Sequence, residues 1–156
     1  MVYEEITRNF RALHDKHEVV VGVQDLPLGS PFSAVLNGEV DAAIAEMPVH
    51  ESELIVGFRF PAQDQLLAVG LDHPSAHRTV IDVEELAEVD LLHRIGDAPA
   101  YWKTARTPAT TPSGAPITSS AGFTSLEQGL TLAATGDCAG LVCRPVAERS
   151  LRGDLH

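Results

Sequence analysis

The sequence predicts an α/β fold, and two apolar stretches with a helix between them carry that prediction. Residues 40–45 are short, apolar and small, which is typical of a strand covered on both faces. Residues 19–23 form a second continuous apolar run and predict a central strand. Between the two runs, Ser30 and Pro31 form a favourable helix start, and Gly38 is a favourable helix end. A helix that leads through a tight turn into a buried strand is half of a parallel β-α-β unit.

The N-terminal residues predict a helix over residues 2–14, because apolar side chains recur there at spacings of four, four and three. Residues 25–30 follow the first strand and lead into the next helix. In open parallel sheets, ligands bind at the carboxyl ends of strands, beside helix N-termini. This loop is therefore a candidate wall of a binding site, with an ordinary strand-to-helix connector as the equal alternative.

The middle of the chain predicts two strands, at residues 54–60 and 65–70, with a turn between them. Asp82 with Glu85 three residues later has the arrangement of a capping box, with Asp in place of Ser or Thr. A short strand is expected at residues 91–93. Tyr101 and Trp102 then favour a helix, in which packing against the core is the simpler interpretation of both rings.

The C-terminal third begins with a Pro-rich loop at residues 107–116 and a strand end at residues 117–120. Two overlapping capping boxes, Thr124 with Glu127 and Ser125 with Gln128, predict the start of a helix. A strand over residues 139–142 and a helical turn from Pro145 follow.

A cluster of hydroxyl groups is predicted where that strand ends and that helix begins. Ser119, Ser120 and Thr124 are expected there, together with main-chain N–H groups and the positive end of the helix dipole. Such an environment suits a carboxylate. Plain helix capping is the equal alternative.

Composition limits the possible functions. The 156 residues suit one modest domain or two small lobes. With 11 basic and 22 acidic residues, the chain carries a net charge of −11, which argues against binding nucleic acid or an anionic membrane by itself. The sequence contains no apolar run long enough to span a membrane and shows no secretory signal, so we expect a cytoplasmic protein.

The sequence contains no recognisable catalytic or metal-binding motif, and we expect neither an enzyme nor a cofactor. His73 and His77 are spaced like metal ligands, but Pro74 interrupts any helix through them and no third ligand is evident. Cys138 and Cys143 form no disulfide framework and are expected to be small buried side chains.

Four stretches, in order, resemble the effector-binding domain of LysR-type transcriptional regulators. They are residues 36–45 followed by Pro48, residues 66–74 ending in His-Pro, the helix start at residues 80–87, and residues 130–142. No single stretch is specific, and the resemblance depends on their order and spacing over residues 1 to 150.

The resemblance implies a periplasmic-binding-protein-like fold, in which two Rossmann-like lobes with mixed, mainly parallel sheets are joined by crossover hinge strands. Residues 1–156 would form a single effector-binding domain, with lobe I at about 1–47 and lobe II at about 52–150. A small organic effector, with carboxylates as the leading class, would bind between the lobes. The candidate effector-binding residues are Leu28, Gly29, Ser30, Met47, Ile95, Gly96, Asp97, Tyr101, Ser119, Ser120 and Thr124.

The sequence also departs from the family pattern. The winged helix-turn-helix, the linker helix and the first strand of the effector domain are not evident, so we expect a truncated fold and no direct contact with nucleic acid. The exposed sheet edges favour a homodimer or higher oligomer. Glu46 stands where family members often carry a basic residue, which disfavours an anionic effector unless Arg94 and Lys103 compensate.

Two other functions are also compatible with the sequence. One is a solute-binding or enzyme-like protein on the same fold, because a fold does not determine function. The other is a truncated remnant that acts only in protein–protein association.

Overall fold

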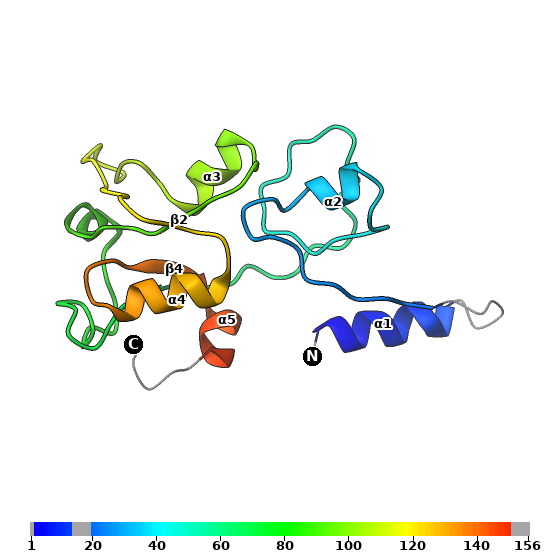
Figure 1. The fold of residues 1–156 in the computed structure, drawn as a ribbon, viewed down its shortest axis with the longest axis horizontal. Coiled ribbons are helices and arrows are strands. Elements are labelled where there is room, and N and C mark those ends of the chain that lie inside the picture. The colour runs from blue at the N-terminus through cyan, green and yellow to red at the C-terminus, as the bar shows by residue number, and fades with distance from the viewer. Residues whose placement is uncertain (1, 14–19, 151–156) are drawn as a thin grey trace.

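The computed structural model describes residues 2–13 and 20–150 of the chain (Figure 1). The helices and strands in these residues are α1 (Val2–Leu13), α2 (Ser33–Leu36), β1 (Gln65–Ala68), the 3-10 helix η1 (Val83–Glu88), β2 (His93–Arg94), α3 (Ala100–Arg106), β3 (Gly122–Phe123), α4 (Leu126–Ala134), β4 (Gly140–Cys143) and α5 (Arg144–Arg149). We call residues 20–60 the N-terminal part and residues 65–150 the C-terminal part.

The C-terminal part contains two two-stranded sheets. β1 pairs antiparallel with β4, and β2 pairs in parallel with β3. Two isolated parallel bridges link the two sheets. Leu91 pairs with Ala139, just before β4, and Asp90 pairs with Thr118, in the segment that leads to β3. The spatial order is therefore β1, β4, β2, β3, and the parallel pairings within it confirm an α/β arrangement.

Two apolar clusters hold this sheet to its helices. Leu91, Val69 and Ile117 belong to the first cluster, with Val89, Ala76 and Ala139. The second is built from Leu92, Phe123 and Ala133, so it joins the sheet to α4. Leu91 and Ala139 are almost completely buried, which is expected of a central strand with side chains covered on both faces.

The strands expected in the N-terminal part do not form. Apart from α2, the described residues 20–60 are extended or turned, and none of them pairs into a strand. The predictions at 20–23, 40–45 and 54–60 are therefore wrong; Val19 lies outside the described residues. A strand exists only where a neighbouring chain satisfies its N–H and C=O groups, and these stretches have no such neighbour among the described residues. Apolar side chains consequently remain in contact with solvent, and Ile55 is 97% exposed.

The start of the second helix also differs from the prediction. α2 begins at Ser33, and its N-cap is Phe32, which makes no side-chain capping bond. Ser30 is not the cap, because its hydroxyl oxygen instead accepts the main-chain N–H of Asp97 at 3.5 Å. Gly38 has φ 70°, which confirms it as the left-handed residue that follows the helix.

Most elements of the C-terminal part are confirmed, and so is the helix at the N-terminus. α1 covers Val2–Leu13, with residue 14 outside the described residues. The Asp82–Glu85 capping box forms, although it starts a 3-10 helix. Ser125 caps α4 by accepting the N–H of Gln128, whereas Thr124 bonds to the Gln128 side chain instead of forming a box with Glu127.

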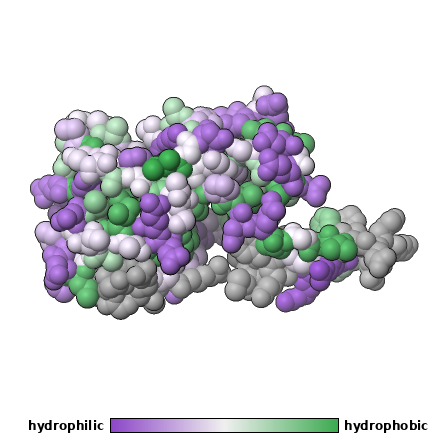
Figure 2. All heavy atoms as spheres, viewed as in Figure 1, coloured by the Kyte–Doolittle hydropathy of each residue, from purple (hydrophilic) through white to green (hydrophobic). Residues whose placement is uncertain are grey.

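Figure 1 shows α1 set apart, along the longest axis of the molecule, from the C-terminal part that contains α3, α4 and β4. On the face drawn in Figure 2, hydrophobic residues are interspersed with hydrophilic ones over both parts of the chain. Cys138 and Cys143 are free, as expected, but they are half-buried rather than buried.

Candidate functional site

The N-terminal and C-terminal parts meet along a line of contacts that we call the seam. Its centre is the main chain of Gly29 against that of Ile95 and Gly96, and the carbonyl oxygen of Gly29 accepts the N–H of Ala98 at 2.9 Å. A Cβ atom placed on Gly29 would collide with the Ile95 carbonyl, and one on Gly96 would collide with the Gly29 carbonyl. Glycine is therefore required at both positions for this close approach.

Asp97 links the loop after β2 to α2 in the next stretch of the seam. Its two carboxylate oxygens accept bonds from the Ser33 hydroxyl at 3.1 and 3.0 Å. Hydrogen bonds from Ser30 and Ser33, with a smaller contribution from the charge of Lys103, lower the pKa of Asp97 below its usual value. The negative form of Asp97 is thus the one that stabilises the seam.

Glu46 lies at the centre of a charged cluster on the seam. Arg94 binds its carboxylate through both terminal nitrogens, at 2.7 and 3.2 Å, and Arg106 approaches one of the same oxygens at 3.3 Å. The Glu46 carbonyl accepts the indole N–H of Trp102 at 2.9 Å, and the Met47 carbonyl accepts a bond from Arg106 at 2.7 Å. One short segment of the N-terminal part is therefore held through both its side chain and its main chain.

Trp102 provides the apolar floor of this cluster. Its side chain is 1% exposed and packs edge-to-face on Phe32, with the ring centroids 6.3 Å apart. The guanidinium groups of Arg94 and Arg106 lie over its ring, 5.3 and 5.9 Å from the centroid. Such cation–π contacts favour the charged side chains where they are partly withdrawn from water. Core packing of Trp102 is confirmed, and the same ring also positions two cations.

Tyr101 completes the seam on the other side of α3. Its hydroxyl donates to Glu51 at 2.5 Å and accepts the main-chain N–H of His50 at 3.0 Å, while its ring stacks on that of His50. Partial burial acts to raise the pKa of Glu51, but the bonds from Tyr101 and from main-chain N–H groups hold it below its usual value. Burial, together with the bond to Glu51, raises the pKa of Tyr101.

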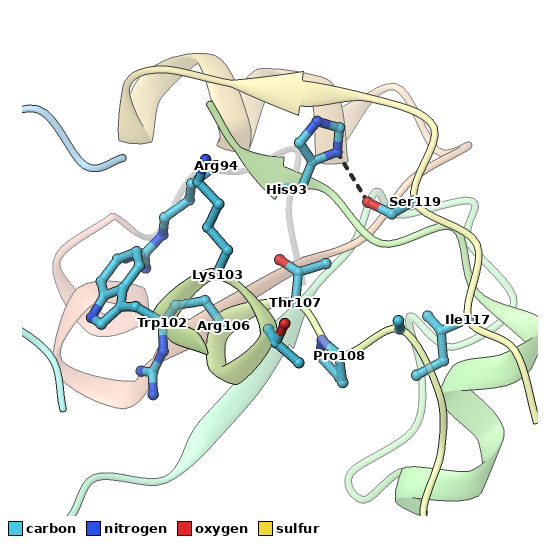
Figure 3. Close-up of a pocket in the computed structure, with 11 residues that line it drawn as sticks. His93, Arg94, Trp102, Lys103, Arg106, Thr107, Pro108, Ile117 and Ser119 are labelled. Atoms are coloured by element: carbon cyan, nitrogen blue, oxygen red, sulfur yellow. Dashed lines mark hydrogen bonds between the residues drawn. The ribbon is translucent and has the colours of Figure 1, made fainter. Parts of the chain in front are cut away.

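A pocket of about 330 Å³ lies directly behind the arginines, between α3 and the sheet (Figure 3). Figure 3 shows Arg94 and Trp102 gathered at one end and Ile117 at the other, with the bond from His93 to Ser119 along one side. The residues labelled around it are His93, Arg94, Trp102, Lys103, Arg106, Thr107, Pro108, Ile117 and Ser119.

The charge of this pocket is opposite to that of the chain. Arg94, Lys103 and Arg106 line it, and no Asp or Glu side chain does so among the described residues. Glu46 neutralises part of this charge from the seam side. The Nε atom of Arg106 is buried and has no hydrogen-bond partner in the described part of the chain, so one donor is available. Paired arginines beside an apolar ring form an arrangement that can bind a planar anion.

The structure brings most of the predicted site residues together, but on the seam rather than around an open cleft. Leu28 packs on the apolar cluster of Leu92 and Phe123. The other predicted residues in mutual contact across the seam, or next to such a contact, are Gly29, Ser30, Met47, Ile95, Gly96, Asp97 and Tyr101.

The predicted hydroxyl cluster is divided by the structure. Ser119 lines the pocket and donates to the Leu91 carbonyl at 2.7 Å. The hydroxyl of Ser120 bonds to Asp90, and that of Thr124 bonds to Gln128, so both are engaged within the C-terminal part away from the pocket lining.

Sequence reasoning missed the convergence of Arg94 and Arg106 on the Glu46 carboxylate, and of Trp102 on the main-chain carbonyl of the same residue. A signal was present, because Arg94, Lys103 and Arg106 are three of only 11 basic residues and lie within one short stretch. Their partner, however, is 48 and 60 positions away in the sequence, and no local periodicity reveals such a pairing.

The described residues were compared with the requirements of a metal site and of a membrane-spanning helix. No group of three or more His, Cys, Asp or Glu side chains is placed to hold a metal ion there. His73 instead accepts the N–H of Ser75 on Nδ1. No helix in the same residues is long and apolar enough to cross a membrane.

The fold and the pocket define an α/β ligand-binding domain of the periplasmic-binding-protein-like type. The LysR substrate binding domain family matches residues 4–156, and the chain belongs to that family. This membership identifies the chain as a substrate-binding domain of the LysR type.

A solved structure supports the same fold. The crystal structure of HinK, a LysR family transcriptional regulator from Pseudomonas aeruginosa, is similar with a TM-score of 0.62 and 13% sequence identity. The similarity covers 90% of this chain and 47% of HinK, so the chain spans about half the length of that regulator. No curated protein matches the sequence.

Proposed function

We propose that this domain senses a small organic carboxylate, which binds beside the seam and changes how the two parts of the chain sit together. In this proposal the chain acts as two lobes, lobe I at about residues 1–47 and lobe II at about 52–150, so that residues 52–60 of the N-terminal part belong to lobe II. An effector that binds one arrangement of the lobes more tightly than another shifts the population toward it. Its role is binding rather than catalysis.

The observation that carries the proposal is the basic pocket in an acidic chain. A chain with net charge −11 places Arg94, Lys103 and Arg106 around one cavity. Three cations close together repel one another, and the single negative charge of Glu46, which it shares between Arg94 and Arg106, balances only one of the three charges. An incoming carboxylate completes the balance through charge-assisted hydrogen bonds.

The shape and lining of the pocket limit the ligand class. A volume of about 330 Å³ lies at the small end of ligand sites, which run from roughly 300 to 1,000 Å³. Trp102 adds apolar surface beside the arginines, and Pro108 and Ile117 add further apolar surface to the lining. We therefore expect a compact carboxylate with an apolar or aromatic body, and phenylacetate is a suitable probe of that class.

Within this proposal the predicted residues take different roles. Ser119 forms part of the pocket wall and, through its bonds to His93 and the Leu91 carbonyl, holds that wall in place. Gly29, Gly96 and Asp97 position the lobes at the seam, where the ligand's effect is transmitted. Ser120 and Thr124 hold the local structure at the start of α4 through their internal bonds.

The test is a series of thermal melts of the full chain with phenylacetate, butyrate, an amino acid and a neutral sugar. A ligand at a hundredfold excess over its dissociation constant stabilises the native state by about 2.7 kcal/mol, or roughly 5–10 °C for a domain of this size. Carboxylates should raise the midpoint and the sugar should not. A shift by the sugar alone, or by none of the compounds, would overturn the carboxylate assignment.

A second function, association with another copy of the chain, is favoured by exposed apolar side chains in one stretch. Ile55, Phe58 and Phe60 are exposed, and the two phenylalanine rings pack against each other. We propose that the working form is a homodimer or higher oligomer in the cytoplasm, without direct contact between this acidic chain and DNA. Analytical ultracentrifugation should find more than the monomer, and Phe58→Ser should shift the mass distribution toward it.

A further inference from the structure

The Glu46 side chain accepts hydrogen bonds from Arg94 and Arg106 in the same way as the carboxylate of a bound ligand would. Two terminal nitrogens of Arg94 face its two oxygens, at 2.7 and 3.2 Å, and Arg106 reaches the same group. Arginine commonly recognises carboxylates through this bidentate arrangement. All three side chains are half-buried, with 35% of the Glu46 side chain exposed, 16% of Arg94 and 21% of Arg106.

The same arginines belong to the pocket, and Glu46 does not. Arg94 and Arg106 line the cavity, whereas Glu46 reaches them from the N-terminal part across the seam. A carboxylate in the pocket would bond to the same two guanidinium groups whose terminal nitrogens Glu46 now uses. Both guanidinium groups also lie over the Trp102 ring, and these cation–π contacts help to position them.

We infer that Glu46 is a built-in competitor for the effector's carboxylate, and that effector binding releases Glu46 from Arg94 and Arg106. This inference rests on the proposed function and adds the way in which binding is regulated. Release removes the only side-chain ion pairs that the described residues form between the N-terminal part and α3 or β2. The ligand thereby weakens one link of the seam while the contacts at Gly29 and Asp97 persist.

Competition of this kind makes a quantitative prediction. The apparent dissociation constant of the ligand equals its intrinsic value divided by the fraction of molecules in which the arginines are available. Removing the charge of Glu46 raises that fraction. For a half-exposed ion pair with a bidentate arginine, the expected gain in affinity is about threefold to tenfold.

The experiment compares Glu46→Gln with Glu51→Gln by isothermal titration with phenylacetate, using the full chain in each case. Glu51 is the matched control, because it is also a seam carboxylate but bonds to Tyr101 rather than to an arginine. Phenylacetamide, which is neutral and of the same shape, is titrated in parallel. A thermal melt of each variant verifies folding, and Glu46→Ala replaces Glu46→Gln if the latter does not melt cooperatively.

The inference predicts that phenylacetate binds Glu46→Gln about threefold to tenfold more tightly than the native chain, with Glu51→Gln unchanged. Equal or weaker binding to Glu46→Gln, while the native chain binds, would overturn the competition and leave the proposed function standing. The competition would also fail if phenylacetamide gained affinity to the same extent. If phenylacetate bound none of the three proteins, the proposed carboxylate site itself would fail.

Discussion

Gly29 and Gly96 lie main chain against main chain at the centre of the seam, with no space for a side chain on either residue. The contact joins a loop of the N-terminal part to the loop after β2, and the bond from Ala98 to the Gly29 carbonyl continues it. Because every other seam contact flanks this one, the fit of two glycines sets the distance between the two parts.

The first prediction concerns these glycines. Gly96→Ala should force the loops apart, at a cost of about 1–3 kcal/mol in the free energy of unfolding, or roughly 3–10 °C in the midpoint. Gly57→Ala is the matched control, because a Cβ there meets nothing within 4 Å. Thermal melts of both variants decide the matter, and equal midpoints for the two would show that the seam tolerates a side chain.

The second prediction concerns the pH dependence of the bond between Tyr101 and Glu51. The folded pKa of Glu51 is lowered, so this carboxylate stabilises the native state above its unfolded pKa of about 4.3, and the contribution is lost as the pH falls through the lower folded pKa. Tyr101→Phe removes the bond and should lower the midpoint at pH 7. The difference between the native chain and the variant should shrink below about pH 4.3. A difference that stays constant down to pH 3 would contradict this account.

The third prediction separates two neighbouring serines. Ser119 lines the pocket and bonds to His93 and the Leu91 carbonyl, whereas Ser120 bonds to Asp90. Only Ser119→Ala should weaken phenylacetate binding, by about threefold to tenfold, because the pocket wall loses the hydrogen bonds that hold it in place. Ser120→Ala should leave the affinity unchanged while lowering the melting midpoint slightly. Isothermal titration measures both. Loss of binding in Ser120→Ala alone would move the site toward the N-terminus of α4, where the sequence pattern first suggested it.

The C-terminal part could largely be predicted from the sequence, because its signals are local. The capping residues Asp82 and Ser125 stand where η1 and α4 begin, and the left-handed Gly136 follows α4. The buried run that forms β4 finds partners on both sides, in β1 and in the residues before β2. Helix caps and apolar runs therefore suffice where a sheet is present to receive the strands.

The N-terminal part could not be predicted in the same way. The runs at residues 20–23 and 40–45 have the composition of strands, but strand formation depends on a partner, which composition does not reveal. Ser30 has the features of a helix cap, yet tertiary contact with Asp97 uses its hydroxyl instead. The site depends even more on long-range contact, since Glu46 meets arginines that no local pattern connects to it.

The most direct test of the central claim is a fluorescence titration with phenylacetate. Trp102 is the only tryptophan in the sequence and lines the pocket, so its emission reports on the site alone. Arg94→Gln removes the principal cation, and Arg144→Gln is the matched control, because Arg144 pairs with Asp64 at the surface away from the pocket. The account predicts a saturable change in the native chain and in Arg144→Gln, with at least about tenfold weaker binding in Arg94→Gln. No saturable change in the native chain, or the same curve for all three proteins, would contradict it.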